Sequence, residues 1–364
     1  MCQAGTGIVP RRSGGVGMFA ESVDVVIGVD THRDSHALAL LDAGLGALVA
    51  EERVDANREG YRRALKLASG CGRRRLWAVE GTGSYGAGLA RFLQRQGERV
   101  LELERPVRGG SRGRAKSDAL DALRAARAAL SGEPLAELRS GGQREALRVL
   151  LVSREASVAV RRRGLNQLRA LVLTAPAELR ERLQGQPKRA LVKRCVALRP
   201  RPGQQPQLRG TLLALRSCGR QVELASREAA DLERELAALV EQLAPQLLSH
   251  YGVGPITAAQ LLVSWSHPGR LRSEAAFARL AGAAPIPCSS GKTIRHRLDR
   301  GGDRQLNRAL HTIVLARRRG DQQTIAYIHR RIKEGKTERE AIRSLKRYIA
   351  RSLYRLLEHS HRTA

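Results

Sequence analysis

The 364-residue sequence predicts an α/β domain with a mixed sheet, followed by a mainly helical remainder. Two observations support this fold class. In the first third of the chain, short apolar runs alternate with longer amphipathic segments, which is typical of strands alternating with helices. From residue 139 onward, the apolar residues recur with a helical period instead.

The α/β domain is predicted over residues 20–135. Three strands come first, because their apolar runs are separated by turn-forming residues such as AGLG. Helices and strands then alternate, which completes a mixed sheet. The expected strands are 24–30, 36–42, 47–53, 74–80 and 98–103. The expected helices are 57–69, 84–96 and 116–130. Residues 1–19 lack an apolar signal core and are expected to form a disordered leader.

Two further regions follow the sheet domain. Residues 139–245 show heptad-like apolar spacing, interrupted by a Pro- and Gln-rich linker at 198–207. This spacing fits a helical hairpin that packs on itself, and it fits a coiled-coil arm for dimerisation equally well. Residues 246–364 form a third region that ends in a basic amphipathic helix from Glu338 to Glu358.

The third region opens with a glycine-containing turn in YGVGPITAAQLL. Gly252 and Gly254 resemble the turn of a helix-hairpin-helix element, in which backbone N–H groups meet a phosphate. A helix that simply ends at one of these glycines explains the same residues. The two glycines are therefore candidate nucleic-acid contacts with an ordinary structural alternative.

Charge is the strongest compositional signal. Lys and Arg number 65 against 35 Asp and Glu, so the formal net charge is +30, and the isoelectric point is about 11.4. Such an excess favours a polyanionic partner through direct attraction and counterion release. Arg far outnumbers Lys, as in GC-rich genomes, but that bias changes only the Lys-to-Arg ratio. We therefore expect the chain to bind nucleic acid, and the 3% aromatic content argues against single-strand stacking platforms.

The five cysteines show no CxxC motif and no His pairing at metal spacing. Neither a disulfide framework nor a zinc site is expected, and a reducing compartment is predicted. No apolar run approaches the ~20 residues of a membrane helix. These features predict a cytoplasmic protein that binds no membrane.

Four acidic residues stand out in this basic chain. Asp30 closes the apolar run VVIGVD, Glu80 closes LWAVE, and Asp118 and Asp121 lie three residues apart in KSDALDA. Carboxylates at the ends of neighbouring strands converge on one side of a sheet, and residues i and i+3 share a helix face. Such oxygens bind Mg²⁺, and two such ions clamp both reacting oxygens of a phosphodiester. The four carboxylates together predict a Mg²⁺ or Mn²⁺ site, although each carboxylate alone is typical of a turn or of a solvated helix face. The hairpin after Asp30 is typical of a ribonuclease H-like fold.

A second motif, PCSSGKT, places Ser289 and Ser290 in an Arg-dense segment. A cationic shell stabilises the charge that develops on an attacked phosphate. The motif alone is more typical of a phosphate-contacting loop or a helix N-cap than of a nucleophile. The candidate nucleic-acid-binding residues of this segment are Lys292, Arg295, Arg297, Arg300 and Arg304.

Five segments of the chain resemble one known family. The RuvC-like domain of DEDD transposases is similar to GVDTHRDSHALALLD, VEGTGSYG and KSDALDA. Their C-terminal transposase domain is similar to GVGPITAAQLL and LAGAAPIPCSSGKTIRHRLDRGGDRQLNRALH. The chain thus resembles the insertion-sequence one-ten family, described as bridge-RNA-guided recombinases. The resemblance implies that Asp30, Glu80, Asp118 and Asp121 form a metal-binding tetrad. It also implies that Ser289 or Ser290 attacks DNA and forms a transient phosphoserine link.

The same resemblance implies the partners: DNA at the element ends and target, a noncoding guide RNA, and further copies of the chain in a dimer or tetramer. Two other functions remain open from the residues. A metal-dependent endonuclease, of the Holliday-junction resolvase type, would use water in place of serine and explains the tetrad and the charge. A non-catalytic nucleic-acid-binding protein explains the charge but not the tetrad.

Overall fold

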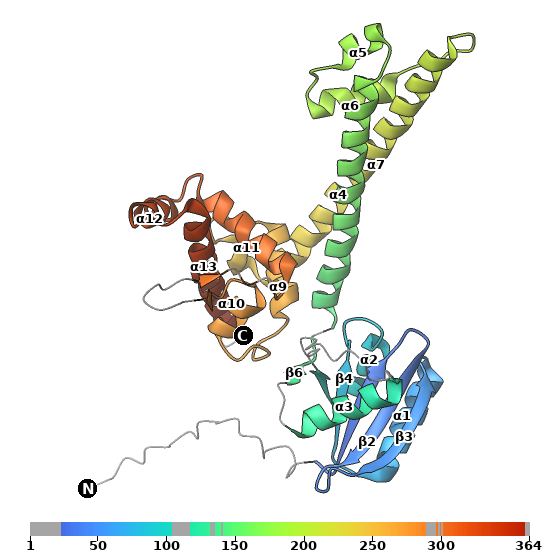
Figure 1. Ribbon diagram of the computed structural model, residues 1–364, viewed down its shortest axis with the longest axis vertical. Helices are drawn as coiled ribbons and strands as arrows, with labels where there is room; N and C mark the ends of the chain where they lie inside the picture. Colours follow the sequence, from blue (N-terminus) through green and yellow to red (C-terminus); the bar gives the residue numbers. More distant parts are fainter. Residues whose placement is uncertain are drawn as a thin grey trace. The chain divides into compact units, whose positions relative to one another are not determined.

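The structure is a computed structural model of the chain (Figure 1). It describes residues 23–103, 117–131, 135–139, 141–288, 296, 297, 299 and 301–360. The chain forms two compact units, Met1–Arg139 and Ser140–Ala364. Each unit has its own hydrophobic cores. The leader expected at 1–19 lies outside the described residues.

A six-stranded mixed sheet forms the centre of the first unit, in the order β3-β2-β1-β4-β5-β6. Antiparallel pairing joins β1 to β2 and β2 to β3, whereas β4 runs parallel to both β1 and β5. The strands are β1 (Val25–Thr31), β2 (Ser35–Asp42), β3 (Leu48–Asp55), β4 (Arg75–Glu80), β5 (Arg99–Leu103) and β6 (Leu135–Glu137). The predicted mixed, ribonuclease H-like sheet is confirmed. Its antiparallel edge strand β6 was not expected, because three residues carry too little pattern to indicate a strand.

Helices cover both faces of this sheet (Figure 1). One face packs against α1 (Arg58–Cys71) and α2 (Ala87–Arg95), and the other packs against α3 (Asp118–Leu130). Successive residues of a strand point to opposite faces. Ile27 of β1 therefore packs with α1 and α2, whereas Val26 packs with α3. By the same alternation, Gly28 and Asp30 lie on the α3 face.

The helix α3 approaches β1 closely. A Cβ atom added to Gly28 would lie 2.1 Å from the carbonyl oxygen of Ala122 and 2.3 Å from the amide nitrogen of Ala126. The buried residues of α3 are all alanines, so the helix has no bulky side chain to hold it away from the sheet. Its N-cap residue, Ser117, accepts a hydrogen bond from the amide of Leu120. This packing sets the position of the first turn of α3 over the sheet.

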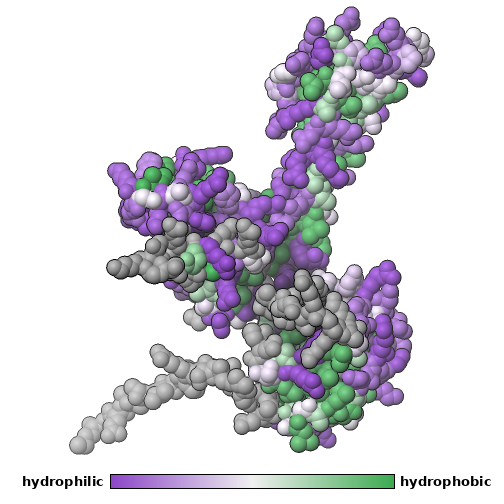
Figure 2. All heavy atoms as spheres, viewed as in Figure 1, coloured by the Kyte–Doolittle hydropathy of each residue, from purple (hydrophilic) through white to green (hydrophobic). Residues whose placement is uncertain are grey.

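Two long helices, α4 (Gln143–Leu173) and α7 (Pro206–Leu243), pack along each other in the second unit. Their connection holds α5 (Ala177–Leu183) and α6 (Lys188–Ala197) (Figure 1). The two long helices thus form a hairpin that packs on itself, and a dimerisation role for the same helices stays a prediction. Hydrophilic residues cover much of the visible surface of this hairpin (Figure 2).

The rest of the second unit is a helical domain around one apolar core, which includes Trp265 and Phe277. Its helices are α8 (Pro245–Leu248), α9 (Pro255–Trp265), α10 (Glu274–Leu280), α11 (Arg304–Arg317), α12 (Gln322–Lys333) and α13 (Glu338–Ser360). A two-stranded ladder pairs β7 (Ile286–Pro287) with β8 (His296–Arg297). Within the described part of the chain, no helix is long and apolar enough to span a membrane.

Candidate functional site

Two of the four predicted carboxylates end neighbouring parallel strands. The β1–β4 register runs to the pair Val29 and Val79, so Asp30 and Glu80 follow side by side. The hydroxyl of Thr31 donates a 2.9 Å hydrogen bond to the carbonyl oxygen of Glu80 and joins the two strand ends. The side chain of Asp30 is only 14% exposed. Both carboxylates therefore belong to the α3 face, at the carboxyl ends of β1 and β4.

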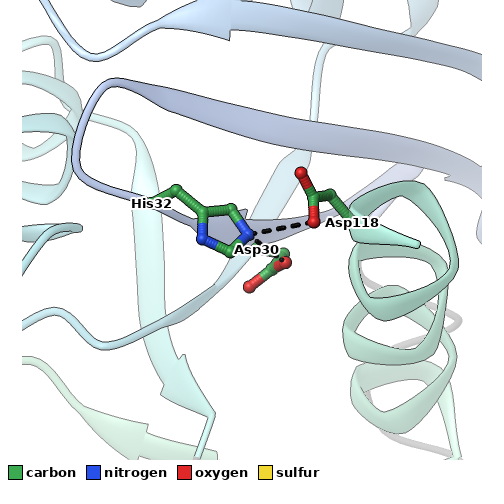
Figure 3. Close-up of side chains that lie close together, drawn as sticks. All are labelled: Asp30, His32 and Asp118. Carbon is green, nitrogen blue, oxygen red and sulfur yellow. Dashed lines mark hydrogen bonds and ion pairs between the residues drawn. The ribbon is translucent and has the colours of Figure 1, made fainter. Parts of the chain in front are cut away.

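The side chain of His32 connects Asp30 to Asp118 at the start of α3. Its Nε2 atom lies 3.1 Å from Oδ2 of Asp30 and 3.1 Å from Oδ1 of Asp118 (Figure 3). One ligand atom from each of the three residues lies within 4.8 Å of the others. Among the residues that the structure describes, this is the one such group of three potential metal ligands.

Asp121 belongs to the same electrostatic cluster. Burial raises the pKa of Asp30, the charge and hydrogen bond of His32 oppose that shift, and the carboxylates of Asp121 and Asp118 add to it. Like charges this close repel one another, and a bound cation relieves the repulsion. Asp118 and Asp121 also lie in the first turn of α3, where the helix N-terminus favours negative charge.

Two arginines complete the cluster. An Nη1 atom of Arg53 lies 3.3 Å from Oδ2 of Asp118, and Nη1 of Arg124 donates a 2.6 Å hydrogen bond to Oδ1 of Asp121. Arg53 reaches the site because Asp30 pairs with Ala37, and Ala37 pairs with Arg53, in one row across three strands. Positive charge thus already faces two of the carboxylates.

The sequence prediction omits His32, Arg53 and Arg124. His32 had a usable signal, because it follows Asp30 by two residues and a period of two keeps it on the same face. Arg124 lies three residues after Asp121 on a predicted helix, which is ion-pair spacing. Arg53 had no such signal, because its place depends on the register of β2 with β3.

Five residues of the predicted serine segment lie outside the described residues: Ser289, Ser290, Lys292, Arg295 and Arg300. The flanking strands are described, and Ile286 pairs with Arg297 in an antiparallel ladder. Arg297 and Arg304 are both exposed, as side chains that contact DNA must be.

The two ends of this segment are fixed to each other. The amide of Asp303 donates a 2.6 Å hydrogen bond to the carbonyl oxygen of Leu280. Gly282 and Gly302 both have positive φ, at 59° and 80°, and a Cβ atom on Gly302 would lie 2.3 Å from the carbonyl oxygen of Leu280. Only glycine fits so close an approach in this conformation.

One side chain of α11 ties this junction to α13. The amide of Asn307 donates a 2.6 Å hydrogen bond to the carbonyl oxygen of Ala281, and its Oδ1 accepts a 2.9 Å bond from the buried ammonium of Lys346. Burial lowers the pKa of Lys346, and the charge of Arg343 lowers it further. The base of the serine segment is therefore anchored to two helices of the second unit.

The turn at Gly252 and Gly254 does not end a helix. The helix α8 ends at Leu248, and Gly254 is the N-cap residue of α9. The amide of Gly254 donates to the hydroxyl of Thr257, and the next residue, Pro255, has no N–H. Neither Gly254 nor Pro255 therefore offers a free backbone N–H to a phosphate. A role for this turn in binding nucleic acid stays a prediction.

Two family models match the chain. A DEDD transposase domain of the IS110 type matches residues 27–175, and the transposase IS116/IS110/IS902 family matches residues 244–329. A 129-residue stretch is 37% identical to an uncharacterised protein of insertion element IS110 from Streptomyces coelicolor. The match covers 35% of this chain and 32% of that protein, so the chain aligns with about a third of the length of this curated relative.

Proposed function

This chain belongs to the IS116/IS110/IS902 family of transposases, and from that premise we propose that it cuts and rejoins DNA strands during transposition. The cluster on the α3 face supports this proposal most directly. There, two segments distant in sequence, the end of β1 and the start of α3, bring ligand atoms of Asp30, His32 and Asp118 within 4.8 Å of one another. The net charge of +30 supports a nucleic-acid substrate.

Asp30, Glu80, Asp118 and Asp121 would hold Mg²⁺ or Mn²⁺. The fit rests on their chemistry, because oxygen ligands suit these ions. Burial raises the pKa of Asp30, and the neighbouring carboxylates of Asp121 and Asp118 add to that shift. A bound metal ion would polarise the scissile phosphate and stabilise the leaving oxygen. Arg53, at the edge of the cluster, would contact a phosphate oxygen of the same DNA strand.

Ser289 or Ser290 would supply the nucleophile. Attack of the serine Oγ on the phosphorus forms a phosphoserine bond, breaks the P–O3′ bond and leaves a free 3′-OH. Attack by the 3′-OH of the incoming strand then restores a phosphodiester and the serine hydroxyl. The bond energy is conserved in the protein–DNA link, so rejoining needs no high-energy cofactor.

The proposed partners are DNA at the element ends and target, a noncoding guide RNA and further copies of the chain. The guide RNA and the oligomer rest on the family resemblance. In an oligomer, the acidic cluster of one subunit would meet the serine segment of another. Mixing Asp30→Ala protein with a serine variant would then restore activity, whereas no recovery would favour a site within one chain.

A covalent-adduct assay tests the proposal. Purified protein, RNA transcribed from the noncoding flank of the element, and labelled junction and target DNA would be combined with Mg²⁺. Denaturing gels would compare the wild type with Asp30→Asn, Ser289→Ala and Ser290→Ala. We expect a metal-dependent adduct that disappears in Asp30→Asn and in one serine variant.

Two outcomes would replace the proposal. Cleavage without an adduct, unchanged in both serine variants, would identify an endonuclease that uses water. DNA binding that persists in EDTA, with no cleavage under any metal, would identify a non-catalytic nucleic-acid-binding protein.

A further inference from the structure

We propose that His32 is a nitrogen ligand of the metal centre, and that the centre therefore prefers Mn²⁺ to Mg²⁺. This inference rests on the proposed function of the acidic cluster, and it adds a ligand outside the four carboxylates. The separations between ligand atoms support it. An octahedral ion with bonds of ~2.1 Å holds adjacent ligand atoms ~3.0 Å apart. Nε2 of His32 lies 3.1 Å from one oxygen of Asp30 and 3.1 Å from one oxygen of Asp118.

The backbone holds the imidazole in this position. His32 follows the last residue of β1, and its amide donates a 3.0 Å hydrogen bond to the carbonyl oxygen of Ser35, the first residue of β2. The next pair of the ladder, Thr31 with His36, closes that turn. The side chain of His32 is 47% exposed, so solvent-borne ions reach it. Its Nε2 atom nevertheless points between the two carboxylates (Figure 3).

The same contacts would suit a second role, in which His32 is a cation that neutralises the carboxylates. Other groups already fill that role. Arg53 faces the second oxygen of Asp118, Arg124 pairs with Asp121, and both carboxylates lie at the electropositive start of α3. The imidazole between the two carboxylates is then best explained as a ligand, since histidine is the commonest metal ligand in proteins.

A nitrogen ligand changes the preference among metal ions. Carboxylate and water oxygens suit Mg²⁺, whereas imidazole nitrogen favours first-row transition ions. We therefore expect wild-type protein to bind Mn²⁺ more tightly than Mg²⁺. Replacing His32 should lower the Mn²⁺ affinity by about 10-fold or more and leave the Mg²⁺ affinity less affected.

Electron paramagnetic resonance of Mn²⁺ tests this directly on the full chain. Titration of free Mn²⁺ and its displacement by Mg²⁺ would give both affinities. Spin-echo modulation would show whether an imidazole ¹⁴N nucleus is coupled to the bound ion. The variants would be His32→Ala and His32→Gln, with His329→Ala, an exposed histidine of α12, as the matched control. Thermal unfolding would confirm that each variant is folded.

We expect ¹⁴N coupling in the wild type and in His329→Ala, and none in either His32 variant. Bound Mn²⁺ without ¹⁴N coupling in the wild type would overturn the assignment even if every variant failed to fold. Tighter Mn²⁺ binding in His32→Ala would overturn it as well, because it would identify His32 as a competing cation. A wild type that binds neither ion would instead refute the proposed metal-dependent function, and the assignment of His32 with it.

Discussion

Replacing Gly28 with alanine should disable the metal centre without altering any of its ligands. Gly28 lies on β1 two residues before Asp30, directly beneath α3. The added Cβ would lie 2.1 Å from the carbonyl oxygen of Ala122 and 2.3 Å from the amide nitrogen of Ala126. Both are backbone atoms of α3, so no side-chain rotation relieves the clash. The helix itself must move away from the sheet.

The size of that movement follows from the contact distances. Ordinary contact begins at 3.4 Å, so α3 must shift by about 1.3 Å from the 2.1 Å position. Overpacking of this kind costs about 1–3 kcal/mol of folding free energy. The same shift carries Asp118 and Asp121 away from Asp30, because both lie in the first turn of α3. A displacement of ~1 Å in a catalytic constellation costs about 10²-fold in rate.

The assay compares Gly28→Ala with a matched glycine substitution. Gly70, in α1, has no heavy atom within 4 Å of an added Cβ, and Gly70→Ala should stabilise the protein by ~0.5–1 kcal/mol. Urea unfolding, Mn²⁺ affinity and DNA cleavage would be measured for both variants. We expect weaker metal binding and about 10²-fold slower cleavage for Gly28→Ala only. Wild-type metal affinity and cleavage in a folded Gly28→Ala protein would refute the close packing of α3 on β1.

Three further predictions concern stability and the second unit. Burial lowers the pKa of His36 below its ordinary value of 6.5. The unfolded chain therefore binds the proton more readily than the folded protein, and the free energy of unfolding should fall as the pH drops below about 6.5. The variant His36→Leu should make the free energy of unfolding less dependent on pH in that range. Burial raises the pKa of Glu98, but hydrogen bonds from Arg75 and Trp77 outweigh it and lower the pKa overall. Glu98→Gln should therefore lower the free energy of unfolding, measured with urea at pH 7, by about 3 kcal/mol, because it leaves the largely buried Arg75 without its charge partner. A loss below ~1 kcal/mol would show that the pair is not desolvated. Asn307→Ala should reduce formation of the serine adduct while Mn²⁺ affinity stays at the wild-type value, and equal losses of both would contradict a local role for this residue.

Much of the first unit is predictable from local pattern. The predicted strands that end at Asp30 and Glu80 are bounded by polar residues, and their apolar runs indicate burial on both faces. The helix starting at Asp118 begins just after a serine N-cap, with acidic residues in its first turn. Because these signals are local, the sequence places the carboxylates at strand ends and at a helix start. Their role as metal ligands stays a prediction.

The remaining features depend on contacts between distant segments. Arg53 enters the cluster only through the pairing of two strands, and no local pattern sets that register. The approach of α3 to Gly28 depends on how the helix lies across the sheet. The role of Asn307 also depends on distant segments, because its side-chain amide forms hydrogen bonds with both Ala281 and Lys346. Sequence periodicity predicts which face of a helix or strand is buried, but it does not predict which segment packs against that face.

Anomalous diffraction from Mn²⁺ would test the metal centre most directly. Crystals of the full chain would be grown with saturating Mn²⁺, and data would be collected just above the manganese absorption edge. The geometry of the cluster predicts an anomalous peak bonded to carboxylate oxygens of Asp30 and Asp118, on the α3 face of the sheet. An ordered cluster without a peak, or a peak bonded to other residues, would contradict the assignment of these carboxylates as metal ligands.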